Sequence, residues 1–343
     1  MDINQILEKL QSKKDLSRED LSSIVQDFKE KKLNDEGIKN LVISWKEKKE
    51  TPDELKELAG LINNLQNQKE IHKDAIDMCG TGGDKSNTFN ISTLAAIVAS
   101  SCGLKVIKHS GRSTTSISGS VDILSEFGFN IDTPDEIKEN CFKQAGLMVV
   151  SSKVLREIFG DVKKVCKKIN SPGFVNLLGP LTNPYKTSYH LLGVSNIEWG
   201  KLLANTLLLQ GQKEALVVCS KIKNEIYLDE LSFCGENYIW HLAEGEINEE
   251  VITPSDLGHK LVNLNDLTIN NITDSKSVFE TILRRGLSNC PKTEIVALNA
   301  GAALYLTKKV KSIKEGYDMA LRNIYLGMGW EHLQIFLNCN KKE

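Results

Sequence analysis

Residues 75–93 read AIDMCGTGGDKSNTFNIST, and this stretch decides how the chain folds. Its apolar beginning, residues 75–79, predicts a short buried strand, and the residues after about Ser92 predict a helix that ends at Gly103. Between them, the glycines of residues 80–84 permit positive φ and let backbone N–H groups approach a ligand closely. Because the N-terminus of a helix attracts negative charge, this order of elements favours anion binding. On spacing alone the loop is also compatible with a structural turn, since it matches neither G-x-G-x-x-G nor a P-loop.

Further apolar strands are predicted at residues 105–108, 147–150 and 215–219, with helices between them. One of these helices runs through Ile123 and Leu124 to near Gly128. The next is predicted to begin at a capping box, Thr133-Pro134-Asp135-Glu136. Residues 276–343 are helix-rich. Strands that alternate with helices predict an α/β fold with a central, mainly parallel sheet flanked by helices.

The N-terminal residues carry a different pattern, in which apolar side chains such as Ile6 and Leu10 recur at helical spacing. A second capping box, Thr51-Pro52-Asp53-Glu54, predicts the start of a helix. We therefore expect residues 1–72 to form a small helical domain, completed by helices around residues 155–195. Residues 73–343 would form the larger α/β domain, and 343 residues are enough for about two domains.

The composition excludes several classes of protein. Hydrophobic residues make up 41% and charged residues 26% of the chain, which is typical of a globular protein. The net charge of −2 creates no general attraction to nucleic acid or to an anionic membrane. No apolar stretch reaches the ~18 residues of a membrane span, and the N-terminus does not read as a signal peptide. The eight cysteines form no C-x-x-C pair, so we expect reduced thiols in a cytoplasmic protein.

Two polar segments follow neighbouring predicted strands. Hydroxyl and amide side chains crowd residues 86–93, and residues 108–116 read KHSGRSTTS. Because ligands of open α/β sheets bind at the carboxyl ends of strands, these segments predict a site for an oxygen-rich ligand such as a polyphosphate, a ribose or a hydrated metal. Taken alone, each segment could also consist of ordinary polar surface residues that bind no ligand.

Taken together, the motifs resemble one family. Gly80-Thr81-Gly82-Gly83-Asp84, Asn90-Ile91-Ser92-Thr93, Lys108-His109, Ser118-Gly119-Ser120, residues 176–184 (NLLGPLTNP) and Asp229-Glu230 stand in the order found in anthranilate phosphoribosyltransferases. The resemblance covers nearly the whole chain. The related pyrimidine nucleoside phosphorylases share the Lys-His and Ser-Gly-Ser motifs but not the full set.

The resemblance implies a helical and an α/β domain with the active site between them. It also implies Mg²⁺, a homodimer, and transfer of a phosphoribosyl group from 5-phosphoribosyl pyrophosphate to an aromatic amine in tryptophan synthesis. It assigns Mg²⁺ to Ser92, Asp229 and Glu230, and catalysis to Lys108, Asp229 and Glu230. The substrate contacts carried over are Gly80, Thr81, Gly82, Gly83, Asp84, Thr88, Asn90, Ile91, Ser92, Thr93, Lys108, His109, Arg112, Ser116 and Ser120.

The acceptor side departs from the family pattern. The family's basic loop reads Lys-His-Gly-Asn-Arg, and in this chain Gly111 stands at the position of its Asn. Further on, Arg156-Glu157-Ile158 stands where the family has a His-Pro-Ala segment. Cys166 stands where the family has an arginine that pairs with the anthranilate carboxylate, and a cysteine cannot make that bidentate bond. Candidate substitutes are Lys163, Lys164, Lys167, Lys168 and Arg156.

The motifs for the phosphoribosyl donor are thus complete, whereas the residues expected around the acceptor are altered. Four hypotheses are compatible with this pattern. The first is an anthranilate phosphoribosyltransferase with an unusual acceptor pocket. The second is a phosphoribosyltransferase for another aromatic or heterocyclic acceptor. The third is a non-catalytic relative that binds nucleic acid or another anionic partner, which the net charge disfavours. The fourth is a nucleoside phosphorylase, which the segment 176–184 disfavours.

Overall fold

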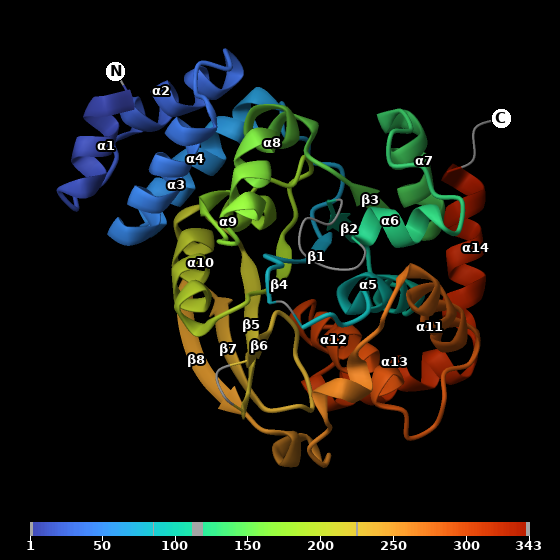
Figure 1. The fold of residues 1–343 in the computed structure, drawn as a ribbon. Coiled ribbons are helices and arrows are strands. Elements are labelled where there is room, and N and C mark those ends of the chain that lie inside the picture. The colour runs from blue at the N-terminus through green and yellow to red at the C-terminus, as the bar shows by residue number, and fades with distance from the viewer. Residues whose placement is uncertain (1–2, 85, 112–118, 224–225, 341–343) are drawn as a thin grey trace.

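The computed structural model describes residues 3–84, 86–111, 119–223 and 226–340 (Figure 1). Its helices are α1 (Ile3–Gln11), α2 (Arg18–Lys29), α3 (Asp35–Lys48), α4 (Pro52–Leu65), α5 (Ile91–Ser101), α6 (Ser120–Ser125), α7 (Asp135–Ala145), α8 (Lys153–Lys168), α9 (Phe174–Leu181), α10 (Ile197–Leu209), α11 (Ile272–Arg284), α12 (Pro291–Leu306), α13 (Ile313–Tyr325) and α14 (Met328–Asn340). Its strands are β1 (Ile76–Gly80), β2 (Val106–His109), β3 (Leu147–Val150), β4 (Tyr189–Gly193), β5 (Glu214–Ile222), β6 (Ile226–Leu228), β7 (Glu236–Ala243) and β8 (Glu246–Ile252).

The strands form one sheet in the order β3-β2-β1-β4-β5-β7-β8, with β6 paired to β5. The pairs from β3 to β5 are parallel, whereas β6, β7 and β8 extend the sheet with antiparallel pairs. The predicted α/β class with a mainly parallel sheet is therefore confirmed. Because β2 lies on one side of β1 and β4 on the other, the strand order reverses at β1, and open sheets bind ligands at such a point.

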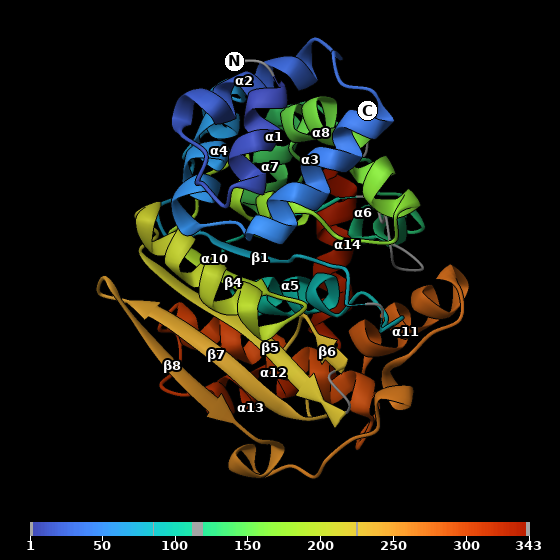
Figure 2. The same cartoon turned by 60° about the vertical axis from the view of Figure 1, so that its left-hand side comes forward.

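The sheet is covered on both faces (Figure 2). Alternate residues of β5 point to opposite sides: Leu216 and Val218 join the core that includes α5 and α12, while Val217 and Cys219 join the core that includes α10. Figure 2 shows α10 across one face, with α12 and α13 behind the other. Burial on both faces explains the continuous apolar run at residues 215–219.

Helices α1–α4 pack with α8 and α9 into a layer at one end of the sheet (Figure 1). The predicted capping box at Thr51 is confirmed, because Glu54 N–H donates to Thr51 Oγ1 and Thr51 N–H donates to the Glu54 carboxylate. The buried Glu54 carboxylate also accepts from Trp45 Nε1 and Lys48 Nζ, and so it ties α3 to α4. In the segment 155–195, α8 and α9 join this layer but β4 lies in the sheet. The division into domains 1–72 and 73–343 stays a prediction.

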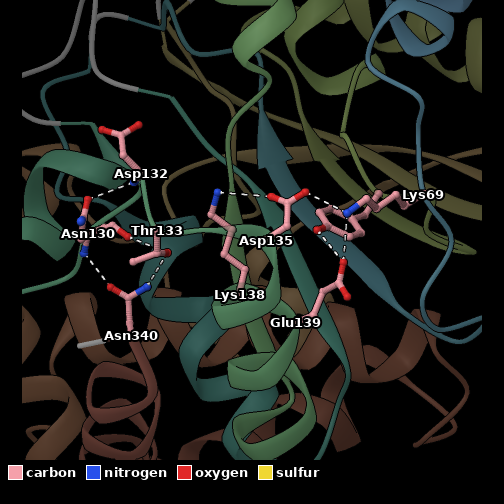
Figure 3. Close-up of polar contacts among 9 residues, drawn as sticks. Lys69, Asn130, Asp132, Thr133, Asp135, Lys138, Glu139 and Asn340 are labelled. Carbon is pink, nitrogen blue, oxygen red and sulfur yellow. Dashed lines mark hydrogen bonds and ion pairs between the residues drawn. The ribbon is translucent and has the colours of Figure 1, made fainter. Parts of the chain in front are cut away.

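The predicted capping box at Thr133 is wrong. Helix α7 begins at Asp135 with Pro134 as its N-cap and no side-chain cap. Figure 3 shows the reason, since Thr133 Oγ1 bonds to the Asn130 carbonyl and to Asn340 Nδ2 of α14. Long-range contacts with the C-terminal helix thus override the local signal. On the other side of α7, Lys69 pairs with Asp135 and Glu139 and joins the α4–β1 connection to this helix.

In the part of the chain that the structure describes, no helix is long and apolar enough to span a membrane. All eight cysteines lie in that part, and none of them is in a disulfide.

Candidate functional site

A notch opens where β1 and β4 end side by side. Gly80 and Gly193 are register partners at the carboxyl ends of these strands, and Thr81 N–H donates to the Gly193 carbonyl. Asp229 fills the space that side chains at these two positions would occupy. A Cβ at Gly80 would lie 2.6 Å from Asp229 Oδ2, and one at Gly193 would lie 1.6 Å from the Asp229 carbonyl oxygen. Two facing glycines therefore let the Asp229–Glu230 segment reach the glycine loop.

The glycine loop takes a left-handed turn at Gly82 and Gly83, whose φ angles are +63° and +87°. Gly82 N–H donates to Asp229 Oδ2 at 2.9 Å, and Asn176 Nδ2 donates to the Thr81 carbonyl at 3.5 Å. A Cβ at Gly83 would meet only Asn176 Nδ2, at 4.0 Å, so space remains beside this turn. The turn adjoins the N-terminus of α5 through residues 86–90, an arrangement suited to an anionic ligand.

Three carboxyl groups, those of Asp84, Asp229 and Glu230, interact electrostatically beside the loop. The pKa of Asp229 is raised to about 7, first by burial and then by the negative charge of Asp84. The pKa of Glu230 is raised well above its usual range, first by burial and then by Asp229, although Lys108 opposes this. Burial also raises the pKa of Asp84, whose oxygens accept from Ser86. Buried carboxyl groups are hard oxygen donors and fit a divalent cation such as Mg²⁺, whose charge would offset the cost of their burial.

The backbone at Glu230 and Leu231 is held in place by residues to which the sequence analysis assigned no role in the site. Leu231 N–H donates to Asn299 Oδ1, and Asn299 Nδ2 donates to the Leu231 carbonyl, so Asn299 of α12 holds the residue after Glu230. Ser220 Oγ donates to the Glu230 carbonyl at 2.7 Å. The signal for Asn299 was an amide in an otherwise apolar helix, since a buried amide needs partners.

Ser92 and Lys108 are connected to Glu230 by hydrogen bonds. Ser92 N–H, in the first turn of α5, donates to Glu230 Oε1 at 3.0 Å, and Lys108 Nζ donates to Ser92 Oγ at 3.1 Å and to the Met78 carbonyl. Lys108 is 1% exposed, and burial lowers its pKa while the acidic neighbours oppose the shift. The structure thus brings together Ser92, Lys108 and Glu230.

His109 is held by the backbone on both sides of its ring. Its Nε2 accepts from Ser152 N–H at 3.1 Å, and the ring also bonds the Gly179 backbone. Burial lowers the pKa of His109 to about 4, so the imidazole is neutral at pH 7. His109 N–H donates to Asp77 Oδ1, whose other oxygen accepts from Asn183 Nδ2. The sequence analysis assigned no role in the site to Asp77, and it quoted Asn183 only as part of the motif at residues 176–184.

The remaining predicted contacts surround this centre. Thr88 is half-buried, with its hydroxyl 3.2 Å from Ser86 Oγ, and Asn90 Oδ1 accepts from Ser275 Oγ. Ile91 and Thr93 are buried in the first turn of α5. Ser120 begins α6. Arg112 and Ser116 lie outside the described residues, and so does Ser118 of the Ser-Gly-Ser motif.

The residues considered for binding the acceptor carboxylate lie in different surroundings. Cys166 is buried in the core that the helical layer shares, and a Cβ at Gly173 would lie 3.1 Å from its sulfur. Lys164 pairs with Asp161 and Lys168 pairs with Asp35.

Lys163 differs from these lysines. It is half-buried, and burial followed by the charge of Arg156 lowers its pKa. Its charge is also one of the smaller causes of the lowered pKa of His109, after burial, so the two side chains interact electrostatically. Gly111 and Arg156 are exposed. Ser110 is 8% exposed, and its hydroxyl has no partner among the residues described.

Comparisons with known proteins agree with this geometry. A family model described as "Glycosyl transferase family, a/b domain" matches residues 72–329. An anthranilate phosphoribosyltransferase of Chloroherpeton thalassium is 33% identical over 290 residues, 83% of each chain. One of Staphylococcus aureus is 36% identical over 261 residues, 76% of this chain and 77% of the relative.

Solved structures agree as well. The anthranilate phosphoribosyltransferase of Thermus thermophilus superposes with a TM-score of 0.86 at 26% identity and full coverage of both chains. The Saccharomyces cerevisiae enzyme in complex with 5-phosphoribosyl pyrophosphate and Mg shares the fold, with a TM-score of 0.85 at 24% identity over 98% of this chain and 97% of that chain. The chain therefore belongs to the anthranilate phosphoribosyltransferase family.

Proposed function

We propose that this protein transfers the phosphoribosyl group of 5-phosphoribosyl pyrophosphate to anthranilate, with release of pyrophosphate, as a step of tryptophan synthesis. The observation that carries the proposal is the notch at Gly80 and Gly193, where Asp229 and Glu230 meet a glycine loop at the reversal point of the sheet. The fold and the family relationship support the same reaction.

In this proposal the glycine loop at residues 80–84 holds the pyrophosphate. Ser92, Asp229 and Glu230 hold Mg²⁺, which when bound supplies positive charge against the negative charge that grows on the leaving group. Lys108 holds Ser92 by its hydroxyl and adds a second positive charge behind the carboxylates. His109 positions the segment after β2 through Ser152 and Asp77, since its ring nitrogens are engaged with backbone groups.

The amine of the acceptor is already a nucleophile, so the reaction needs positioning more than a strong base. We assign the acceptor carboxylate to Lys163, because Cys166 is buried in the core that the helical layer shares and two neighbouring lysines are paired elsewhere. A lysine binds a carboxylate as a point charge rather than with the two-pronged contact of arginine.

The Lys163 assignment predicts a selective effect on the acceptor. Lys163→Met is expected to raise the KM for anthranilate about 10- to 100-fold, the loss of one charged hydrogen bond, with the KM for 5-phosphoribosyl pyrophosphate unchanged. Steady-state kinetics with each substrate varied in turn measures this. Lys164→Met removes a lysine paired with Asp161 and is the matched control. Equal effects of the two variants, or a rise in both KM values for Lys163→Met, would contradict the assignment.

The raised pKa of Asp229 predicts that Mg²⁺ binding depends on pH. Below about pH 7 the carboxyl group of the metal-free protein is protonated, so the ion must displace a proton, whereas above pH 7 it binds an existing carboxylate. The affinity for Mg²⁺ should fall about tenfold for each pH unit below 7 per proton displaced and level off above it. Calorimetric titrations in buffers of different ionisation enthalpy would measure the proton release. Constant affinity between about pH 6 and about pH 8 would exclude the assignment.

The same proposal includes a homodimer, a cytoplasmic location and the division into domains 1–72 and 73–343. Sedimentation, cell fractionation and limited proteolysis of the full chain test these in turn.

The reaction itself is tested by following anthranilate fluorescence with Mg²⁺ and 5-phosphoribosyl pyrophosphate present and omitted in turn. Loss of fluorescence only in the complete mixture is the expected result. Retained fluorescence together with retained binding of 5-phosphoribosyl pyrophosphate would instead favour a different acceptor, for which Gly111 and Cys166 already supply a reason. Failure to bind 5-phosphoribosyl pyrophosphate would overturn the donor site as well.

A further inference from the structure

A second cluster of potential ligand groups lies inside the sheet. Asp77 and Cys79 are two residues apart on β1 and point to the same face, and His190 of β4 is the register partner of Asp77. Cys79 Sγ lies 3.2 Å from His190 Nε2, and one ligand atom from each of the three residues lies within 4.8 Å of the others. Among the described residues, this is the one group of three or more His, Cys, Asp or Glu side chains whose ligand atoms all lie within 4.8 Å of one another.

Two members of the cluster, Asp77 and His190, border a cavity on the side opposite to the glycine notch. A cavity of about 520 Å³ opens at the amino ends of β1, β4 and β5, and Asp77, Asn183 and His190 are among the residues that line it. Asp77 is 1% and His190 is 4% exposed, so both side chains are almost wholly enclosed by protein. Lysines such as Lys73 and Lys186 also line the cavity. The attraction for a cation must therefore come from the cluster itself at short range, since salt screens exposed charges beyond about 8 Å.

The donor set is specific in its chemistry. A thiolate, an imidazole and a carboxylate suit a borderline-soft divalent ion that prefers tetrahedral coordination, whereas Mg²⁺ takes oxygen donors. Asp77 is oriented by Asn183 Nδ2 at 2.8 Å and by His109 N–H at 2.9 Å, which is the outer support that metal sites require. We propose that Asp77, Cys79 and His190 bind a zinc-class divalent ion, with a water molecule from the cavity as fourth ligand.

Binding converts the Cys79 thiol into a metal-bound thiolate and releases its proton to solvent, while the ion keeps its oxidation state. The ion would cross-link β1 to β4 in the folded protein only. It should therefore raise the Tm in proportion to the logarithm of metal concentration. Its ligands differ from those of the proposed Mg²⁺ site at Asp229 and Glu230, and its test measures metal binding rather than turnover, so its failure is distinguishable from failure of the proposed function.

The test uses full-length protein stripped with a chelator and titrated with Co²⁺, a coloured substitute for Zn²⁺. Thiolate-to-cobalt absorption that saturates at one ion per chain, and that Zn²⁺ abolishes, is expected. Cys79→Ser, which preserves the side-chain volume, should lose this absorption and weaken Zn²⁺ binding by at least about 100-fold. Cys339→Ser alters a half-buried thiol elsewhere and should behave as wild type.

His190→Gln is a second variant, needed if Cys79→Ser does not fold, and it should also lose the absorption. Asp229→Asn should retain it, because that residue belongs to the other site. Absence of thiolate-to-cobalt absorption in the wild type would overturn the proposal. So would its persistence in Cys79→Ser or in His190→Gln, and the cluster would then be a buried thiol–imidazole hydrogen bond only.

Discussion

Glu230→Gln and Asp229→Asn are each expected to lower kcat by about 10²- to 10³-fold with Mg²⁺ and 5-phosphoribosyl pyrophosphate at saturation. Each change keeps the size of the side chain but removes one of the three interacting carboxylates, and an amide is a poorer ligand for a hard ion. Steady-state rates over a range of Mg²⁺ concentrations would measure the effect. Glu246→Gln, which removes an exposed carboxylate at the start of β8, should leave the rate unchanged.

Stability provides a second measurement that separates this effect from unfolding. The pKa of Asp229 is raised to about 7 in the folded protein, against about 3.9 in an unfolded chain, so the folded state binds the additional proton between these values. Stability therefore falls as pH rises through that window. In metal-free protein at about pH 8, Asp229→Asn should melt at a higher temperature than the wild type, because the buried charge is gone. A lower Tm together with the lost rate would point to misfolding, and wild-type rates in both variants would remove the metal assignment.

Gly193→Ala is expected to disable the site through the backbone. The new Cβ would lie 1.6 Å from the carbonyl oxygen of Asp229 and 2.6 Å from its carbonyl carbon, and backbone atoms cannot rotate away as side chains do. Asp229 and Glu230 must shift, and a displacement of about 1 Å at a catalytic group costs about 100-fold in rate. We also expect a loss of about 1–3 kcal/mol in the free energy of unfolding, which is typical of overpacking.

Substitution of two other glycines should have smaller effects than Gly193→Ala, so the three variants can be ranked. At Gly80 the new Cβ would meet the Asp229 carboxylate at 2.6 Å, and a side chain can move, so Gly80→Ala should cost less than Gly193→Ala. At Gly160 of α8 a Cβ meets nothing within 4 Å, so Gly160→Ala should stabilise the helix by about 0.5–1 kcal/mol without loss of rate. Parallel measurement of kcat and chemical denaturation would establish the order. A wild-type rate in Gly193→Ala would mean that the Asp229 segment is not fixed by the notch.

Much of the sheet could be predicted from local pattern. Strand β3 lies at residues 147–150 as predicted, and β1 and β2 begin and end within one residue of their predicted bounds, because continuous apolar runs mark strands buried on both faces. Strand β4 and the short strand β6 were not predicted, and neither were the antiparallel strands β7 and β8. Their alternation is weak, since β8 at the edge of the sheet is mostly exposed.

The sequence by itself determined the elements whose signals are local. These are the glycine turn at residues 80–84, the capped start of α4 at Thr51, and the alternation of strands with helices that makes a parallel sheet. Motifs carried the family resemblance, but Asp229-Glu230 alone reads as an acidic turn. Only the tertiary structure placed Asp229 between Gly80 and Gly193, gave Asn299 its partner at Leu231, and brought His190 to Cys79 across 111 residues of chain. The physical reason is that strand register and burial fix these contacts, and both depend on residues far apart in the chain.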